Sequence, residues 1–130
     1  MIVLDTHYWY WWVGESPRLS AQDRDFIEAN TTDGLAVSAI SCWEIARKTQ
    51  LGKLELDRPV DEWLQLALGY PGVRLVPLNV DIICESTSLP DGFRSDPADE
   101  LIVATARILN APLMTADAAL RAYPHGSLAN

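Results

Sequence analysis

The sequence predicts an α/β fold in which helices cover both faces of a parallel sheet. Two observations carry this prediction. Short apolar runs alternate with longer segments of helical periodicity along the chain, and no repeat, low-complexity tract or linker interrupts the alternation. Strands that alternate with helices are typical of parallel sheets, which need cover on both faces. With 130 residues and 48% hydrophobic composition, the chain is expected to form a single domain, 1–130, with its own core.

Four short, mostly apolar runs are predicted to be the buried strands of this sheet. They are "IVL" (2–4), "LAVS" (35–38), "RLVPL" (74–78) and "PLMT" (112–115). Runs of this length and composition suit strands that are buried on both faces and have no solvent-facing side. The run "LEL" (54–56) is a candidate for a further short strand, so four or five strands are expected.

Five longer segments are predicted to be helices. They are residues 20–30, 41–51, 59–69, 80–88 and 97–109. Gly52 and Asn110 follow two of these segments, and both residue types favour the left-handed conformation that ends many helices. The last segment is apolar nearly all round and has small residues at its centre, as expected of a helix packed tightly against the sheet.

The start of the 97–109 segment concentrates acidic residues beside this apolar helix. Asp96 is a candidate N-cap, with Pro97 at the first helical position and Asp99 at the third, where it would reach back as in a capping box. In the alternative interpretation, some of these carboxylates hold a cation. The structural interpretation of Glu100 is a position on a solvated face. The local pattern leaves both interpretations open.

Two further aspartates lie where strands are predicted to end. Asp5 ends the first strand and Asp117 lies just beyond the last, so both are expected at the sheet edge where open α/β folds bind ligands. Glu44 and Asp99 are each expected in the first turn of a helix at that edge. Two unit charges about 4 Å apart repel by roughly 4 kcal/mol at an effective dielectric near 20. Four converging carboxylates therefore need protons or a cation, and hard oxygen ligands favour Mg²⁺ or Mn²⁺.

Each of these acids also has a purely structural interpretation. Glu44 completes a capping box with Ser41 in "SCWE" and lies four residues before Lys48, a spacing that suits an ion pair. An aspartate after a strand, such as Asp5 or Asp117, is common in turns. The residue pattern alone thus indicates an acidic metal site suited to phosphoryl transfer, with structural roles as the alternative.

The overall composition limits the classes of function. The formal net charge of −8 disfavours sequence-blind binding to nucleic acid through phosphate contacts alone, but it is compatible with a metal-dependent nuclease. No window is long and apolar enough for a membrane span, and "MIVLDTHYWYWW" lacks the basic start of a signal peptide. Cys42 and Cys84 show no metal-ligand spacing and are interpreted as core thiols, which suits the cytoplasm.

Four segments, taken in order, resemble the signature blocks of PIN domains and, more closely, of the VapC-like toxin ribonucleases of bacterial toxin–antitoxin modules. They are "IVLDTHYWYWW", "VSAISCWEIARKTQLGKLEL", "LPDGFRSDPADELIVATA" and "LMTADAALRAY". The resemblance runs from residue 2 to about residue 123; the block "SCWEIARKTQLGKL" is specific, whereas "MTAD" alone is not. It implies a three-layer α/β/α sandwich with a parallel four- to five-stranded sheet, and an endoribonuclease that uses one or two Mg²⁺ or Mn²⁺ ions.

The resemblance also implies catalytic and metal-binding residues. The acidic positions of the family match four carboxylates here, namely Asp5, Glu44, Asp99 and Asp117. Asp5 and Asp99 are the expected direct metal ligands, and Asp117 would hold a coordinated water or a second ion. Asp96 is expected to be mostly a helix cap and an auxiliary ligand. Glu44 would orient or deprotonate the attacking water.

Three other residues are expected to contact the RNA substrate. Thr6 and Thr115 match hydroxyl residues that lie beside the acids in the family. Arg47 follows Glu44 by three positions, so the two share a helix face and Arg47 would meet a phosphate, with a surface ion pair as the alternative.

The chain departs from the family pattern at the 97–109 helix. Relatives commonly read His–x–Asp–Pro–x–Asp–Arg where this chain reads "RSDPADE", so Arg94 replaces the histidine and Glu100 replaces the arginine. His7 also stands where many relatives carry Asn or Ser, and a packing or surface role is expected for it. The departures at Arg94 and Glu100 motivate an alternative function, a catalytically weak PIN fold kept as a protein-binding module. A phosphoacceptor domain is disfavoured. One class of such domains needs Asp–x–Asp after its first strand, and here His7 fills the second acidic position. The other class needs a lysine at a late strand, and this chain has none there.

Five consecutive aromatic residues, "YWYWW" (8–12), lead to the expected partners. If this stretch is helical, successive side chains point about 100° apart, so some of them are expected at the surface or at an interface. Trp and Tyr are favoured anchors in protein interfaces. With the resemblance, this predicts a homodimer and a cognate antitoxin whose basic tail would enter the acidic cleft.

Overall fold

The computed structural model describes residues 1–130 and contains one parallel sheet of four strands. The strands are β1 (Ile2–Leu4), β2 (Leu35–Ser38), β3 (Val73–Val76) and β4 (Leu113–Met114). Their order across the sheet is β3-β2-β1-β4, and every neighbouring pair is parallel. The α/β fold with a parallel sheet is therefore confirmed. The possible strand at 54–56 is wrong, because these residues form an irregular segment that covers α1.

Seven α-helices and one 3₁₀ turn accompany the sheet. The helices are α1 (Thr6–Val13), α2 (Ala21–Ala29), α3 (Ala39–Gln50), α4 (Val60–Leu68), α5 (Val80–Ser86), α6 (Pro97–Leu109) and α7 (Ala118–Ala122), and the 3₁₀ turn is η1 (Pro90–Gly92). All five predicted helices are present, while α1 and α7 are additional. None of these helices is of a length and apolarity that would let it cross a lipid bilayer.

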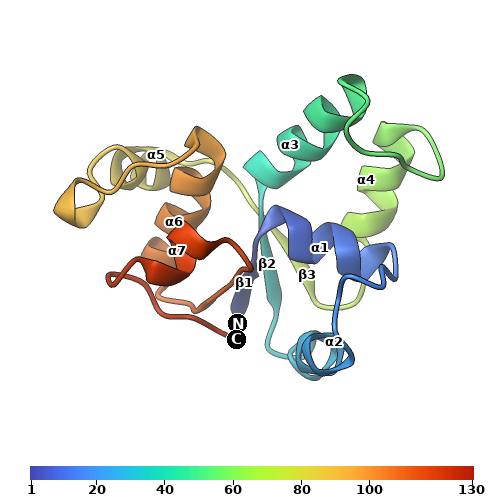
Figure 1. Ribbon diagram of the computed structural model, residues 1–130, viewed down its shortest axis with the longest axis horizontal. Coiled ribbons are helices and arrows are strands. Elements are labelled where there is room, and N and C mark those ends of the chain that lie inside the picture. The colour runs from blue at the N-terminus through green and yellow to red at the C-terminus, as the bar shows by residue number, and fades with distance from the viewer.

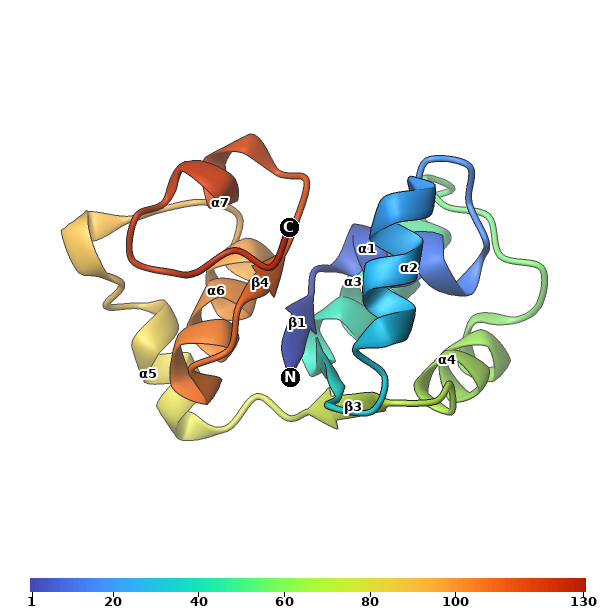
Figure 2. The ribbon, with the colours of Figure 1, turned by 90° about the horizontal axis from the view of Figure 1, so that it is seen from below.

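The helices form two layers, one on each face of the sheet. Figures 1 and 2 show α1, α2, α3 and α4 on one side of the strands and α5, α6 and α7 on the other. Alternate strand residues enter the two cores: Leu4 and Val37 pack with the first group of helices, and Val3 and Ala36 pack with the second. This is the expected three-layer arrangement. Because the strands run parallel, Asp5 and the start of α3 meet at one edge.

The start of α3 differs from the prediction. Strand β2 continues directly into the helix, and Ser38 is the N-cap, with its Oγ accepting a hydrogen bond from the N–H of Ile40 at 3.2 Å. The predicted capping box of Ser41 with Glu44 is therefore wrong. Because α3 begins at Ala39, Glu44 lies in its second turn and its carboxylate is free for other contacts.

Helix α1 is enclosed, which corrects the expectation for the aromatic stretch 8–12. Tyr8, Trp9 and Trp12 are buried, while Tyr10 and Trp11 are partly buried, so none is left exposed. Because α1 is packed between the sheet, α2, α3 and α4, its side chains find neighbours in nearly every direction. The aromatic run is mostly core, and only Tyr10 and Trp11 keep part of their surface exposed.

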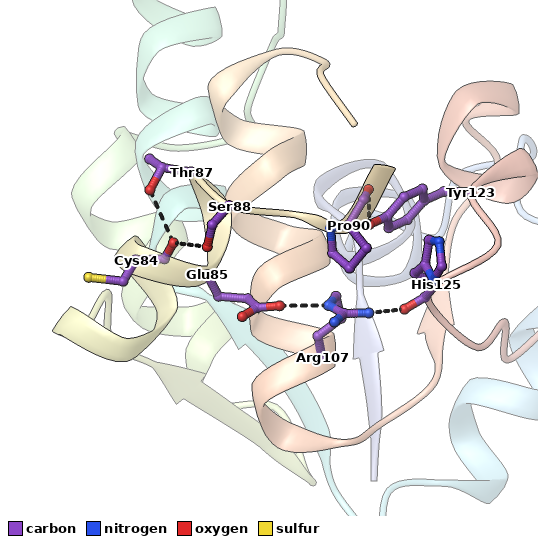
Figure 3. A network of polar contacts seen from close by, with 8 residues as sticks. All are labelled: Cys84, Glu85, Thr87, Ser88, Pro90, Arg107, Tyr123 and His125. Atoms are coloured by element: carbon purple, nitrogen blue, oxygen red, sulfur yellow. Dashed lines mark hydrogen bonds and ion pairs between the residues drawn. The ribbon is translucent and has the colours of Figure 1, made fainter. Parts of the chain in front are cut away.

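The helices of the other layer are tied to the segment after α7 by polar contacts (Figure 3). Arg107 of α6 pairs with Glu85 of α5 at 2.7 Å between Nε and Oε1, and its Nη1 donates to the carbonyl of His125. The Tyr123 hydroxyl donates to the carbonyl of Pro90 in η1 at 3.0 Å. These contacts hold α6, whose first turn carries Asp99.

The two cysteines are not both core thiols. Cys42 on α3 is half-buried, and burial raises the pKa of its thiol. Cys84 on α5 is exposed, because this helix turns only Ile82 and Ser86 toward the interior.

Candidate active site

Asp5 lies at the carboxyl end of β1 and is held by two hydrogen bonds. Its side chain is only 6% exposed. Oδ1 accepts from the N–H of Tyr8 at 2.9 Å, which makes Asp5 the N-cap of α1, and Oδ2 accepts from the hydroxyl of Thr115 at 2.6 Å. Burial raises the pKa of Asp5, although both hydrogen bonds oppose the rise. Asp5 is therefore a buried carboxylate in a fixed orientation, and its capping role and its position at the site coexist.

Thr115 joins Asp5 to Asp117 across the end of β4. While its hydroxyl donates to Asp5, its Oγ1 accepts from the N–H of Asp117 at 3.0 Å. The Asp117 carboxylate in turn caps α7, because Oδ1 accepts from the N–H of Leu120 at 3.0 Å. Thr115 is fully buried, whereas Asp117 is exposed at the mouth of the site.

Glu44 reaches the same edge from α3 and is held by Thr6. The Thr6 hydroxyl donates to Oε1 of Glu44 at 2.5 Å and lies 2.8 Å from the hydroxyl oxygen of Ser41. A hydroxyl has one proton and an ionised carboxylate only accepts, so Ser41 donates to Thr6 and Thr6 donates to Glu44. The predicted pair of Glu44 with Lys48 is also present, at 3.9 Å.

The acids at the start of α6 are held more loosely. Asp99 is half-buried, and its Oδ2 accepts from the hydroxyl of Ser95 at 3.1 Å. Asp96 occupies the N-cap position, but its side chain makes no capping hydrogen bond, so its predicted role as a side-chain cap is wrong. The predicted capping box is also absent. In a capping box the Asp99 carboxylate would accept from the N–H of Asp96, but here it accepts from the hydroxyl of Ser95.

Electrostatic repulsion shows that the acids share one region. Desolvation raises the pKa of Asp99 to about 6, helped by the charges of Asp117, Glu44 and Asp96 and opposed by the Ser95 hydrogen bond. Glu44 also acts on Asp5, raising its pKa. Carboxylates from β1, α3, α6 and the segment after β4 therefore lie within electrostatic range of one or more of the others.

The neighbouring cations compensate little of this negative charge. Lys48 contacts Glu44, and the charge of exposed His7 lowers the pKa of Asp5. His7 packs beside Trp11 with ring centroids 5.7 Å apart, in line with the packing or surface role expected for it. Arg47 is exposed and its Nη1 donates to Oε1 of Gln50 at 2.7 Å, one turn further along α3.

The donor set fits a hard divalent cation in its chemistry, because it consists of carboxylate and hydroxyl oxygens under mutual repulsion. No three His, Cys, Asp or Glu side chains lie at the spacing of ligands to one ion. An ion held by three of these carboxylates would therefore draw them closer together.

Two residues of the site have roles that the sequence did not reveal. Ser41 was interpreted as a helix cap and instead orients Thr6, while Ser95 was assigned no role and holds Asp99. A signal for Ser95 was present, because it lies four residues before Asp99 at a helix start, where short hydroxyl side chains commonly bond to nearby groups. The partner of Ser41 is distant in sequence, and no local pattern indicates it.

Comparison with known proteins defines the family. The family model described as PIN domain matches residues 2–126. The chain belongs to the PIN domain family. Within it, the chain is 39% identical over 124 residues to ribonuclease VapC22 of Mycobacterium tuberculosis, a match covering 95% of this chain and 92% of the relative.

Solved structures show the same fold at low sequence identity. One match is to the crystal structure of VapBC2 from Rickettsia felis bound to a DNA fragment from the promoter, with a TM-score of 0.72 and 18% identity over 98% of this chain and 97% of that one. Another is to a toxin–antitoxin complex from Klebsiella pneumoniae, with a TM-score of 0.67 and 18% identity over 96% and 94%. These similarities confirm the architecture predicted from the sequence.

Proposed function

We propose that this protein is a metal-dependent endoribonuclease and the toxin of a toxin–antitoxin pair. The observation that carries the proposal is the gathering of Asp5, Glu44, Asp99 and Asp117 at the carboxyl edge of the sheet, where burial raises the pKa of Asp99 to about 6 and the charges of Asp117 and Glu44 add to the rise. The identity with a ribonuclease over nearly the whole of both chains supports the choice of RNA as substrate.

The residues divide the work of the reaction by their positions. Asp5 and Asp99 would hold Mg²⁺ or Mn²⁺, and Asp96 and Asp117 would supplement these ligands. Thr115 is bonded to both Asp5 and Asp117 and so orients the two relative to each other. The cation, when bound, neutralises charge on the phosphate and lowers the pKa of water.

Glu44 orients the attacking water and accepts its proton. The Thr6 hydroxyl fixes Oε1 of Glu44, and Oε2, which has only Lys48 at 3.9 Å as a partner, would do this work. Thr6 and Thr115 are buried and their hydroxyls are engaged, so they act on the substrate through the carboxylates that they hold and do not contact it as expected from the sequence. Arg47 contacts a phosphate further along α3 after release from Gln50.

The proposed partners rest on similarity and on the net charge of the chain. The solved structures with this fold include a toxin–antitoxin complex, which supports a cognate antitoxin. A homodimer and a cytoplasmic site of action are part of the same proposal. The formal charge of −8 suits a basic antitoxin tail. Light scattering of the isolated protein tests the dimer, and co-expression with the product of the neighbouring gene tests whether the pair suppresses toxicity.

Cleavage of RNA by purified protein, with and without the cation, tests the activity. We expect cleavage of single-stranded or structured RNA with Mn²⁺ or Mg²⁺, none after EDTA treatment, and recovery when the cation is restored. Equal cleavage by the EDTA-treated protein would contradict the mechanism.

One observation favours a second candidate, a catalytically weak protein-binding module. Glu100 replaces an expected cation beside the acids, and its Oε2 accepts from the N–H of Ser95 at 3.3 Å, which adds negative charge where a substrate phosphate would approach. Calorimetric titration with Mn²⁺ distinguishes the two candidates. Binding lost in Asp5→Asn supports the nuclease, and the absence of any binding that depends on Asp5 supports the module.

A further inference from the structure

Trp43 is exposed to solvent beside the acidic site, and packing within the fold does not explain why a tryptophan stands there. Its side chain is 58% exposed. Of the other four tryptophans, Trp9, Trp12 and Trp63 are buried and Trp11 is partly buried. The sequence places Trp43 directly before Glu44 on α3. A large aromatic side chain left in water beside a candidate active site often marks a contact with a ligand.

Trp43 lines a groove of about 510 Å³ between the starts of α3 and α6. Its floor is apolar, with Ile40 from α3, Leu78 from the segment after β3, and Pro97 from α6. Glu44 and Asp96 line the same groove. The groove is therefore continuous with the candidate active site and is the apolar part of the same cleft.

The chemistry of this groove selects its occupant. Phosphates are repelled by Glu44 and Asp96 unless a cation lies between, whereas a nucleobase is uncharged and flat. A base can stack on the indole ring, and its exocyclic amino group can donate to either carboxylate. The groove combines one exposed aromatic ring with carboxylates at its border, and this pairing of a stacking face with hydrogen-bond acceptors suits a single base.

We propose that Trp43 is a base-stacking residue, and that the groove between α3 and α6 binds the nucleobase next to the scissile phosphate. The inference rests on the proposed RNA cleavage, because it assigns a place to one part of that substrate. Trp43 then determines which base lies next to the cleaved phosphodiester bond and how tightly the RNA is held, while the carboxylates carry out the chemistry.

Four proteins test the inference: wild type, Trp43→Ala, Trp43→Phe and the matched control Phe26→Ala. Phe26 is an exposed aromatic on α2 that takes no part in the groove. For each we would measure kcat/KM with a short single-stranded RNA and Mn²⁺, the Mn²⁺ affinity by calorimetry, and the melting midpoint. Quenching of tryptophan fluorescence by the same RNA gives a readout that does not depend on cleavage.

Loss of one base–aromatic stack predicts a fall of about 5-fold or more in kcat/KM for Trp43→Ala. Trp43→Phe keeps most of the activity, Phe26→Ala keeps all of it, and Mn²⁺ affinity and the melting midpoint stay unchanged in all three variants. RNA quenches the fluorescence of wild type and Phe26→Ala, and the quenching is lost in Trp43→Phe.

Three results would overturn the inference. The first is undiminished cleavage by Trp43→Ala. The second is a fall in the Mn²⁺ affinity of Trp43→Ala that parallels its loss of cleavage, which would make Trp43 a support for the carboxylates. The third is a defect confined to antitoxin binding, which would make the groove a protein-docking site. Wild-type protein that cleaves no RNA with Mn²⁺ would instead refute the proposed function itself. The two failures are therefore distinguishable.

Discussion

The two sides of the acidic site are built differently. On one side, Asp5 is buried and accepts two hydrogen bonds, and Glu44 is fixed by a chain of two hydroxyl groups. On the other side, Asp99 is half-buried with a single hydrogen bond from Ser95, and Asp96 makes no capping bond. Hydrogen bonds within the protein therefore fix the carboxylates of the first side, whereas the repulsion among the carboxylates of the second side stays unrelieved. This difference suggests which acids a cation would move on binding.

The largest expected effect is on catalysis, where both sides are needed. Asp5→Asn and Asp99→Asn should each reduce RNA cleavage by roughly 100-fold or more, since each removes a charge that acts on the transition state. Circular dichroism should show a retained fold. Cleavage by Asp99→Asn close to the wild-type rate would show that the α6 side of the site is dispensable.

The two sides should differ clearly in stability when their hydroxyl partners are removed. Thr115→Val leaves the buried Asp5 carboxylate without one partner, so we expect a loss of about 1–3 kcal/mol in the free energy of unfolding at pH 7. Ser95→Ala removes a bond to a half-exposed group and should cost under about 1 kcal/mol. Urea unfolding of both variants measures the difference, and equal losses would break the comparison.

The raised pKa of Asp99 predicts a pH dependence in the metal-free protein. Its pKa is about 6 in the folded state against 3.8 ordinarily, so the folded protein loses stability as pH rises through that window. Full linkage would give about 3 kcal/mol, which solvent screening of a half-exposed group reduces to roughly 1 kcal/mol. Asp99→Asn should therefore be about 1 kcal/mol more stable than wild type at pH 7 and gain nothing near pH 4. Urea unfolding in EDTA at both pH values tests this, and a variant destabilised at pH 7 would refute it.

The smallest effect is expected at Lys48. Its pair with Glu44 is partly exposed and 3.9 Å long, so Lys48→Ala should change the free energy of unfolding by under about 0.5 kcal/mol. Thr6→Val, which removes the short bond to the same carboxylate, is the matched comparison and should cost more. A larger loss for Lys48→Ala would mean that the ion pair, and not the hydroxyl chain, positions Glu44.

The sequence predicted most of the fold because strand and helix signals are local. The strands at 2–4 and 35–38 were placed at their observed bounds, and the five predicted helices all exist. Helix α1 was not predicted because five consecutive aromatic residues show no polar face. The same run led to the expectation that some of these side chains lie at the surface. Whether such a helix is enclosed depends on neighbours distant in sequence, including α2 and α4.

The candidate site was predicted as a set of acids but not as a network. Parallel strands bring their carboxyl ends together, which is why Asp5 and Asp117 were expected at one edge. The hydroxyl that serves each acid was not predictable, because Thr115 and Asp5 meet only through the pairing of β1 with β4. Ser38 and Ser41 are equally good caps by type, and only the direct passage from β2 into α3 decides between them.

The bond between Thr115 and Asp5 also has a consequence for synthesis of the chain. It joins residues 110 positions apart, and β1 lies between β2 and β4 in the sheet. During translation Asp5 is made 110 residues before Thr115 of its partner strand. Such non-local pairing is slow and closes late in folding. A nascent chain that already carries Asp5, Glu44 and Asp99 therefore still lacks the strand that completes the site, which delays any activity until β4 has been made.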